Sequence, residues 1–190
     1  MSCLGSFKQA SIYQKLVFLL LLISVGLAWI SFVSAAWGDA YVTAASPGTV
    51  TGYGLWRRCG DTDLAPACTD LLGWNLDWYR AVQAFAIIGF VSVHISLLLV
   101  VLLVFVPKCT KSQAVTLWIS VLSLLSALAY TFAVTIFAVG FDSTFEVAGS
   151  DATSVEYGWG LALCVLLLNI VVVVLTIIEA RSIGAKIIDL

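Results

Sequence analysis

Charged residues are scarce in this sequence. Only 11% of the 190 residues are charged, whereas 62% are hydrophobic; a typical soluble domain carries about 25% charged residues. A soluble chain of this length has no way to bury so much apolar surface. The composition therefore predicts an integral membrane protein.

The residue patterns that carry catalysis are also missing. The single histidine, His94, falls within a long apolar run. We find no Walker-type loop, no HExxH motif and no GxSxG motif, and the carboxylates are scattered along the loops. No cluster of basic residues suits a nucleic acid. We therefore expect no enzymatic activity, no cofactor, no metal and no nucleic-acid partner.

Four runs without Asp, Glu, Lys or Arg are long enough to cross a bilayer, and they are residues 16–36, 81–106, 114–141 and 158–178. As a helix, the first alone is about 31 Å long, close to the hydrocarbon thickness. The second and third exceed what a bilayer needs, and we expect their excess to project as helix toward the large loop. The intervening segments are then loops at 37–80, 107–113 and 142–157, with a tail at 179–190.

The first run ends in "VSAAWG", which resembles a signal-peptidase site. Its apolar core is, however, longer than the roughly 7–15 residues of a signal peptide. Trp29 and Trp37 also suit a membrane interface. We therefore expect this run to be retained as a span.

The distribution of charge predicts the orientation. With four spans, the side that holds both termini carries Lys8, Lys15, Lys108, Lys111, Arg181 and Lys186, and the other side carries Arg57, Arg58 and Arg80. Because basic residues favour the cytoplasmic side, both termini are predicted to be cytoplasmic. Most acidic residues then lie outside, so the outer surface is expected to attract cations.

The loop at 37–80 is the largest segment outside the predicted spans. Residues 40–45 and 49–56 mix β-branched and aromatic residues, and Pro47-Gly48 supplies a turn between them, which predicts a hairpin. Cys59 and Cys68 lie on the oxidising side, so we expect a disulfide there; free thiols or metal thiolates are the alternatives. A closed zinc site is disfavoured because it needs four ligands.

The remaining cysteines are expected to have other roles. Cys3 and Cys109 are predicted to be cytoplasmic and close to span ends, so they are candidates for reversible palmitoylation, with plain reduced thiols as the alternative. Cys164, within the last span, is expected to pack in the bundle.

Polar residues inside the spans are expected to bind neighbouring helices. Gln83, His94 and Asn169 are costly in lipid, so interhelical hydrogen bonds are predicted for them. Small residues share one face of run 114–141, which predicts close helix packing there. They are Ser123, Ser126, Ala127, Ala129 and Ala133.

One set of residues resembles the signature of a known superfamily. Trp37 follows the first span, Gly54-Leu55-Trp56 comes next, and then Cys59 and Cys68. This W…GLW…C…C pattern on a four-span chain resembles the claudin superfamily, as does "YRAVQAF" at 79–85. That superfamily includes claudins, the peripheral myelin, epithelial membrane and lens fibre membrane proteins, and calcium-channel gamma subunits.

The resemblance implies a fold and a role for the signature residues. The expected fold is an all-α membrane protein: a left-handed four-helix bundle with a small extracellular antiparallel β-sheet. Leu55 and Trp56 would embed where the sheet meets the helices, and the disulfide would tie two neighbouring strands. Arg80, at the outer mouth of the second span, is expected to snorkel or to cap the sheet.

The resemblance also implies candidate functions. In cation-selective claudins an acidic residue near the position of Asp70 lines the paracellular pore, and Asp61 and Asp63 could add to it; hydration of the surface is the alternative. The second outer loop offers Phe141, Phe145 and Val147 as an edge for contact across two membranes.

We expect a plasma-membrane protein at cell–cell contacts, embedded in lipid, which associates with itself or with related four-span proteins in cis and in trans. A larger channel or receptor subunit is the alternative partner. The chain ends in "KIIDL" where claudins commonly end in tyrosine-valine, so PDZ binding is weakly indicated.

Overall fold

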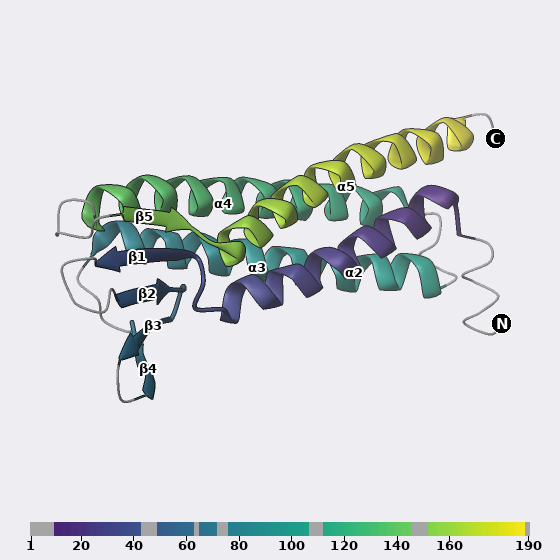
Figure 1. Ribbon diagram of the computed structural model, residues 1–190. Helices are drawn as coiled ribbons and strands as arrows, with labels where there is room; N and C mark the ends of the chain where they lie inside the picture. Colours follow the sequence, from purple (N-terminus) through teal and green to yellow (C-terminus); the bar gives the residue numbers. More distant parts are fainter. Residues whose placement is uncertain are drawn as a thin grey trace. The chain divides into compact units, whose positions relative to one another are not determined.

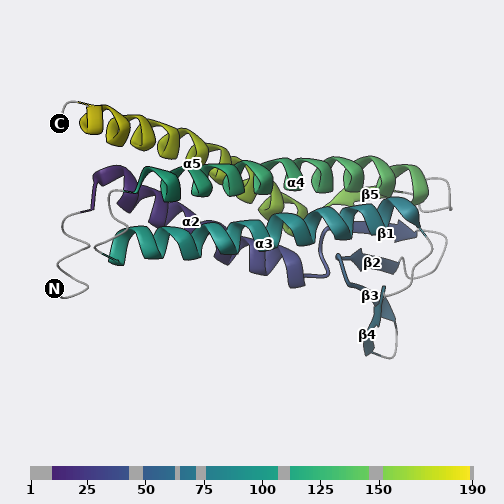
Figure 2. The same ribbon diagram turned by 180° about the vertical axis from the view of Figure 1, so that it is seen from behind.

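The computed structural model describes residues 10–42, 49–62, 65–71, 76–106, 112–145 and 152–188 (Figure 1). Four helices are long and apolar enough to cross a membrane: α2 (Ile12–Val33), α3 (Asp77–Phe105), α4 (Gln113–Phe145) and α5 (Tyr157–Ile188). They form a bundle, as predicted. In both views α3 and α4 run side by side (Figure 2).

The helices extend beyond the apolar runs. α3 begins at Asp77 and α4 continues to Phe145, so both lengthen at the ends that adjoin the strands.

α2 begins with a capping box, in which Gln14 N donates to Ser11 Oγ at 3.1 Å and Ser11 N donates to Gln14 Oε1 at 3.2 Å. This exchange satisfies two backbone donors at the helix start. α5 continues as helix to Ile188.

Five strands form one antiparallel sheet in the order β4-β3-β2-β1-β5. They are β1 (Gly38–Val42), β2 (Thr49–Tyr53), β3 (Arg57–Thr62), β4 (Ala65–Asp70) and β5 (Ala152–Val155). β1 and β2 pair as the hairpin that the sequence predicts, with Tyr41 opposite Val50. β5 comes from the segment between α4 and α5 and pairs with β1. The two extracellular loops therefore share one sheet.

The described chain divides into two compact units. The helical unit comprises Met1–Gly26, Ile88–Leu128 and Val165–Leu190; the sheet-bearing unit comprises Leu27–Ile87 and Ala129–Cys164. Each helix contributes residues to both. We describe the interior of each unit separately.

The helical unit is held by apolar contacts and a few buried hydrogen bonds. Asn169 Nδ2 on α5 donates to Ser24 Oγ on α2 at 2.9 Å, and Ser126 Oγ on α4 donates to Gly89 O on α3 at 3.0 Å. Because lipid offers no competing partner, such bonds select one arrangement of the helices. The interhelical bond predicted for Asn169 is confirmed. The small-residue face of α4 is buried throughout, as predicted.

Of the other two intramembrane polar residues, Gln83 differs from the prediction, whereas the interhelical bond of His94 stays a prediction. His94 Nδ1 lies 2.7 Å from Phe90 O of its own helix. Gln83 Nε2 donates to Leu55 O, in the chain between β2 and β3, at 2.7 Å. The expected interhelical bond of Gln83 is therefore replaced by a bond to the sheet, because α3 begins early enough to bring this residue to the loop.

An aromatic cluster fills the sheet-bearing unit. The rings of Trp37, Tyr79 and Phe141 all pack around Phe137 of α4, with centroid separations of 5.3, 6.1 and 5.1 Å, respectively. All four side chains are buried. Aromatic pairs at such separations add about 0.5–1.5 kcal/mol each beyond their area burial.

The Ser24–Asn169 bond can be measured by a double-mutant cycle. Ser24→Ala and Asn169→Ala each remove one partner of a buried pair, so the single variants and the double variant should not be additive. We expect a coupling energy of about 0.6 kcal/mol, the average for such bonds in membranes. Unfolding of the purified protein in mild detergent gives the four free energies. Strict additivity would show that the bond does not contribute.

Candidate functional site

Trp37 ties the first strand to the end of α2. Its ring is fully buried, and Nε1 donates to Ser31 O at 2.8 Å. Its backbone N donates to Tyr53 O at 2.8 Å, and its carbonyl accepts from Glu156 N at 3.0 Å. One residue thus joins the end of α2, β2 and the segment after β5.

The turn between β2 and β3 consists of Gly54, Leu55 and Trp56. Gly54 N donates to Arg57 O at 2.8 Å, which closes the turn. Leu55 is fully buried, and the Trp56 ring lies 5.1 Å from the ring of Phe32 on α2. We call Gly54–Trp56 the anchor turn.

Two side chains of α3 bind the backbone of the anchor turn. Tyr79 Oη donates to Gly54 O, and Gln83 Nε2 donates to Leu55 O at 2.7 Å. Their spacing of four residues places them on one face of the helix. Sequence reasoning missed this clamp, although Tyr79 and Gln83 stand in the "YRAVQAF" segment that carries the resemblance. The signal was the spacing of two hydrogen-bonding side chains at the start of a span.

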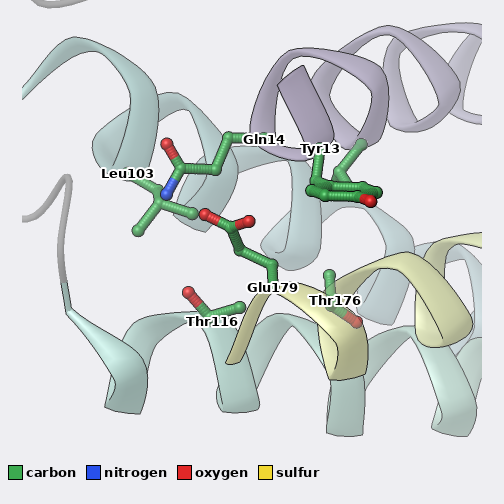
Figure 3. A pocket seen from close by; sticks show the side chains of 7 residues that line it. Tyr13, Gln14, Leu103, Thr116, Thr176 and Glu179 are labelled. Atoms are coloured by element: carbon green, nitrogen blue, oxygen red, sulfur yellow. The ribbon is translucent and has the colours of Figure 1, made fainter. Parts of the chain in front are cut away.

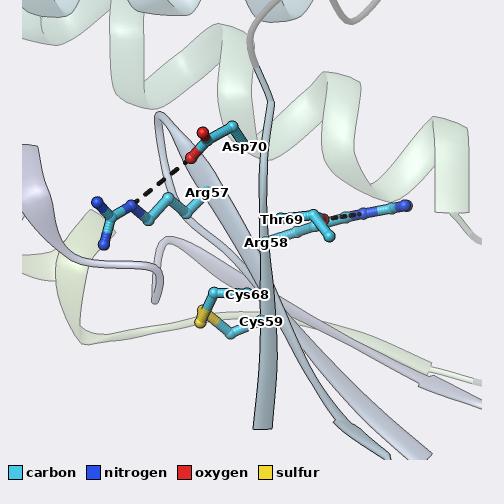
Figure 4. Close-up of a disulfide and its surroundings, with 6 residues drawn as sticks. All are labelled: Arg57, Arg58, Cys59, Cys68, Thr69 and Asp70. Carbon is cyan, nitrogen blue, oxygen red and sulfur yellow. Dashed lines mark hydrogen bonds and ion pairs between the residues drawn. A yellow bond between two sulfur atoms is a disulfide. The ribbon is translucent and has the colours of Figure 1, made fainter.

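The disulfide lies on the next hairpin along the sheet. Cys59 and Cys68 are directly opposite in the pairing of β3 with β4 and are joined, which confirms the predicted bond (Figure 4). Closing a loop of this size contributes about 2.7 kcal/mol in the chain-entropy model. The bond therefore stiffens the hairpin at the edge of the sheet.

The two arginines after Trp56 bind within the same hairpin. Arg57 Nε lies 3.8 Å from Asp70 Oδ1, and Arg58 Nε donates to Thr69 Oγ1 at 2.9 Å (Figure 4). Both side chains of the ion pair are largely exposed, so water screens the attraction. Asp70 nevertheless faces a positive group of its own chain, which weakens its local negative potential.

The other candidate pore residues are less defined. Asp61 lies in β3, whereas Asp63 lies outside the described residues. An ion-selective role for Asp61, Asp63 and Asp70 remains a prediction. Within the described part of the chain, no three His, Cys, Asp or Glu residues gather as a metal site would require.

The structure removes one residue, Phe141, from the contact edge expected in the second outer loop. Phe141 is 1% exposed and packs on Tyr53 with ring centroids 5.5 Å apart, so it belongs to the interior and not to an exposed edge. It is buried because the sheet folds onto the end of α4. Phe145 is the last residue of α4, and Val147 lies outside the described residues.

The other candidates from the sequence are Arg80 and three cysteines. Arg80 is exposed in the first turn of α3. Cys3 and Cys109 lie outside the described residues, so their lipidation stays a prediction. Cys164 is a free, exposed cysteine on α5, which corrects the expectation that it packs in the bundle.

The two faces of the sheet differ in exposure. Ala40 and Tyr53 lie on the face that packs on Phe141, and both are buried. Tyr41 and Val50 point to the opposite face, where they lie directly across from each other and are each 36% exposed. Side chains paired in this way form one contiguous surface. We call Tyr41 and Val50 the exposed sheet pair.

A partly buried carboxylate lies on the same face as this pair. Burial raises the pKa of Asp39 above its usual range, and the nearby carboxylate of Glu156 raises it further. Asp39 lies on β1, and Glu156 follows β5 directly. Two like charges thus meet where the two extracellular loops join.

A substitution of Gly54 tests whether the anchor turn is needed for folding. A Cβ at this position would overlap Ser34 O and lie 2.5 Å from Ala35 Cα, both of which are backbone atoms that cannot move alone. We expect Gly54→Ala to prevent delivery to the cell surface. Gly60→Ala is the matched control, because its Cβ would lie 3.4 Å from Thr51 Oγ1, close to an ordinary contact. Surface biotinylation compares the two, and equal delivery would contradict the role of the turn.

The raised pKa of Asp39 predicts that the stability of the folded protein depends on pH. Because its pKa is higher in the folded state, folding takes up protons there, and the protein loses stability as the pH rises through that pKa. Asp39→Asn removes this loss. The variant should gain in unfolding midpoint over the wild type as the pH rises from about 4, the ordinary pKa of Asp, to 7. A constant difference across that range would show that the pair does not matter.

Comparison with known proteins agrees with this geometry. Among curated proteins, none matches the chain. The sequence model of the PMP-22/EMP/MP20/Claudin family matches residues 15–178, well over half of the chain. The match confirms the resemblance drawn from Trp37, the anchor turn and the two cysteines. It also supports the expectation that the chain is not an enzyme, since members of the family are non-enzymatic membrane proteins. The chain therefore belongs to the PMP-22/EMP/MP20/Claudin family, as a protein with four membrane spans and an extracellular sheet cross-linked by Cys59–Cys68.

Proposed function

We propose that this protein organises membranes at cell–cell contacts by self-association of its extracellular sheet, in cis and in trans. The observation that carries the proposal is the exposed sheet pair on a sheet whose opposite face is buried against α4. The sheet is fixed to the helices by Trp37 and by the clamp from Tyr79 and Gln83.

A surface held in this way suits binding. The anchor turn, the disulfide and the strand ladder already fix the backbone, so association costs little further ordering. Tyrosine is enriched at the centres of protein interfaces, and Tyr41 has an aliphatic neighbour directly across the ladder. Both features support the sheet face as a contact surface.

The charge of the surface supports a preference for cations between the apposed membranes. Most acidic residues of the chain fall in the extracellular segments. Asp61 and Asp70 belong to the β3–β4 hairpin, Asp63 lies between these strands in the sequence, and Arg57 forms an ion pair with Asp70. A local excess of carboxylates concentrates cations near the contact.

A mixing assay tests the proposal. Tagged protein is expressed in fibroblasts that lack tight junctions, these cells are cultured with non-expressing cells, and the signal is quantified at each kind of contact. We expect enrichment only between two expressing cells. Tyr41→Asp places a charge in the contact and should reduce the signal to that of mixed contacts, whereas the control Ser143→Asp, exposed on α4, should not.

The outcomes separate the candidate functions. Undiminished enrichment in Tyr41→Asp would exclude this face as the contact surface. A uniform surface signal of the wild type would contradict adhesion and would favour an auxiliary subunit, to be sought as a larger channel or receptor that co-purifies in mild detergent.

A further inference from the structure

Each of the two units contains a cavity, and the two cavities differ in size. The one in the helical unit, beside Gln14, Thr116 and Glu179, has a volume of about 10 Å³ (Figure 3). This is room for at most one water, so it suits no larger ligand. The sheet-bearing unit has an open cavity of about 150 Å³ between the end of α4 and β5. This volume is about that of five waters, so the second cavity can hold a small organic group.

A carboxylate and a hydroxyl meet in the lining of this larger cavity. Thr153 Oγ1 on β5 donates to Asp142 Oδ1 on α4 at 2.6 Å, which fixes the position of the carboxylate. A carboxylate has two oxygens with several lone pairs, so Asp142 can bind a cationic group while it accepts this bond. In the part of the chain that the structure describes, no lysine or arginine forms an ion pair with Asp142.

The walls of the cavity combine this charge with apolar side chains. The lining consists of Ala138, Phe141, Asp142, Thr153, Ser154 and Val155. A quaternary ammonium group has methyl groups and no N–H, so it binds through apolar contacts and a nearby negative charge. A bare metal ion needs several oxygen ligands and is poorly matched to apolar walls. The lining therefore favours a bulky organic cation.

A stripe of exposed side chains on α4 ends at the cavity. Phe132, Val139 and Asp142 are seven and three residues apart, so they lie on one side of the helix. Phe132 and Val139 are each more than half exposed, and Asp142 is the first charged residue after the apolar run. Exposed apolar side chains of a membrane span contact lipid. An acyl chain on this stripe therefore brings its headgroup to the level of Asp142.

We propose that this cavity binds the choline headgroup of an outer-leaflet phospholipid. The trimethylammonium group lies beside the Asp142 carboxylate, and an acyl chain follows Phe132 and Val139. The charge of the headgroup complements the lining, and the size of the group matches the cavity. The bound lipid would contact both α4 and β5 within the sheet-bearing unit. This site goes beyond the self-association proposed for the sheet and does not rest on it.

Native mass spectrometry of the full-length protein in mild detergent tests the site. The protein is titrated with phosphatidylcholine, phosphatidylethanolamine or phosphatidylglycerol of the same acyl chains, and the fraction that carries one lipid gives an apparent Kd. We expect phosphatidylcholine to bind most tightly, because phosphatidylethanolamine has a smaller ammonium group and phosphatidylglycerol has none. Free phosphocholine at the same concentration should not displace the lipid, since it has no acyl chain to contact α4.

Two variants separate the charge of the site from its space. Asp142→Asn keeps an oxygen that accepts from Thr153 but removes the charge. It should weaken phosphatidylcholine about threefold, the effect of one partly exposed charge pair, without weakening phosphatidylglycerol. Ala138→Leu keeps the carboxylate but fills the cavity, and it should also weaken phosphatidylcholine selectively. The control Asp77→Asn removes an exposed charge that does not line the cavity and should match the wild type.

Several outcomes would overturn the proposal. It fails if phosphatidylglycerol or phosphatidylethanolamine binds as tightly as phosphatidylcholine, or if Asp142→Asn or Ala138→Leu binds as the wild type does. Displacement by free phosphocholine would show that the cavity takes a soluble headgroup and not a membrane lipid. Equal weakening of all three lipids by both variants would also contradict it, because recognition of choline would then play no part.

Discussion

The extracellular part of this protein depends on one arrangement, in which α3 donates two hydrogen bonds to the backbone of the anchor turn. Tyr79 and Gln83 satisfy the carbonyls of Gly54 and Leu55, and Leu55 is buried as a consequence. Backbone carbonyls buried without partners would be costly, so the turn cannot seat its apolar side chains unless the helix supplies these donors. A small sheet that would be marginal alone is thereby held to the helices.

Much of the fold was predictable because bilayers impose simple rules. Apolar length located the four spans. The orientation expected from the distribution of lysine and arginine stays a prediction. The pairing of Cys59 with Cys68 followed from their being the two cysteines on the oxidising side. The β1–β2 hairpin followed from β-branched residues on either side of Pro47-Gly48.

The parts that could not be predicted depend on tertiary contacts. Gln83 looked like an intramembrane polar residue, and only the early start of α3 shows that it binds the sheet. Phe141 looked exposed because it adjoins a loop, yet β1 and β2 cover it.

The strand order has a consequence for how the protein is made. β1 is complete soon after the first span emerges, but its partner β5 follows α4, more than a hundred residues later. Until three spans have been inserted, one edge of β1 therefore lacks its native strand. An open edge of this kind is prone to wrong pairing, and contacts so distant in sequence form slowly. Closure of the sheet by a strand from the second loop is thus a late step of assembly, and it requires that the first three spans have already been placed across the membrane.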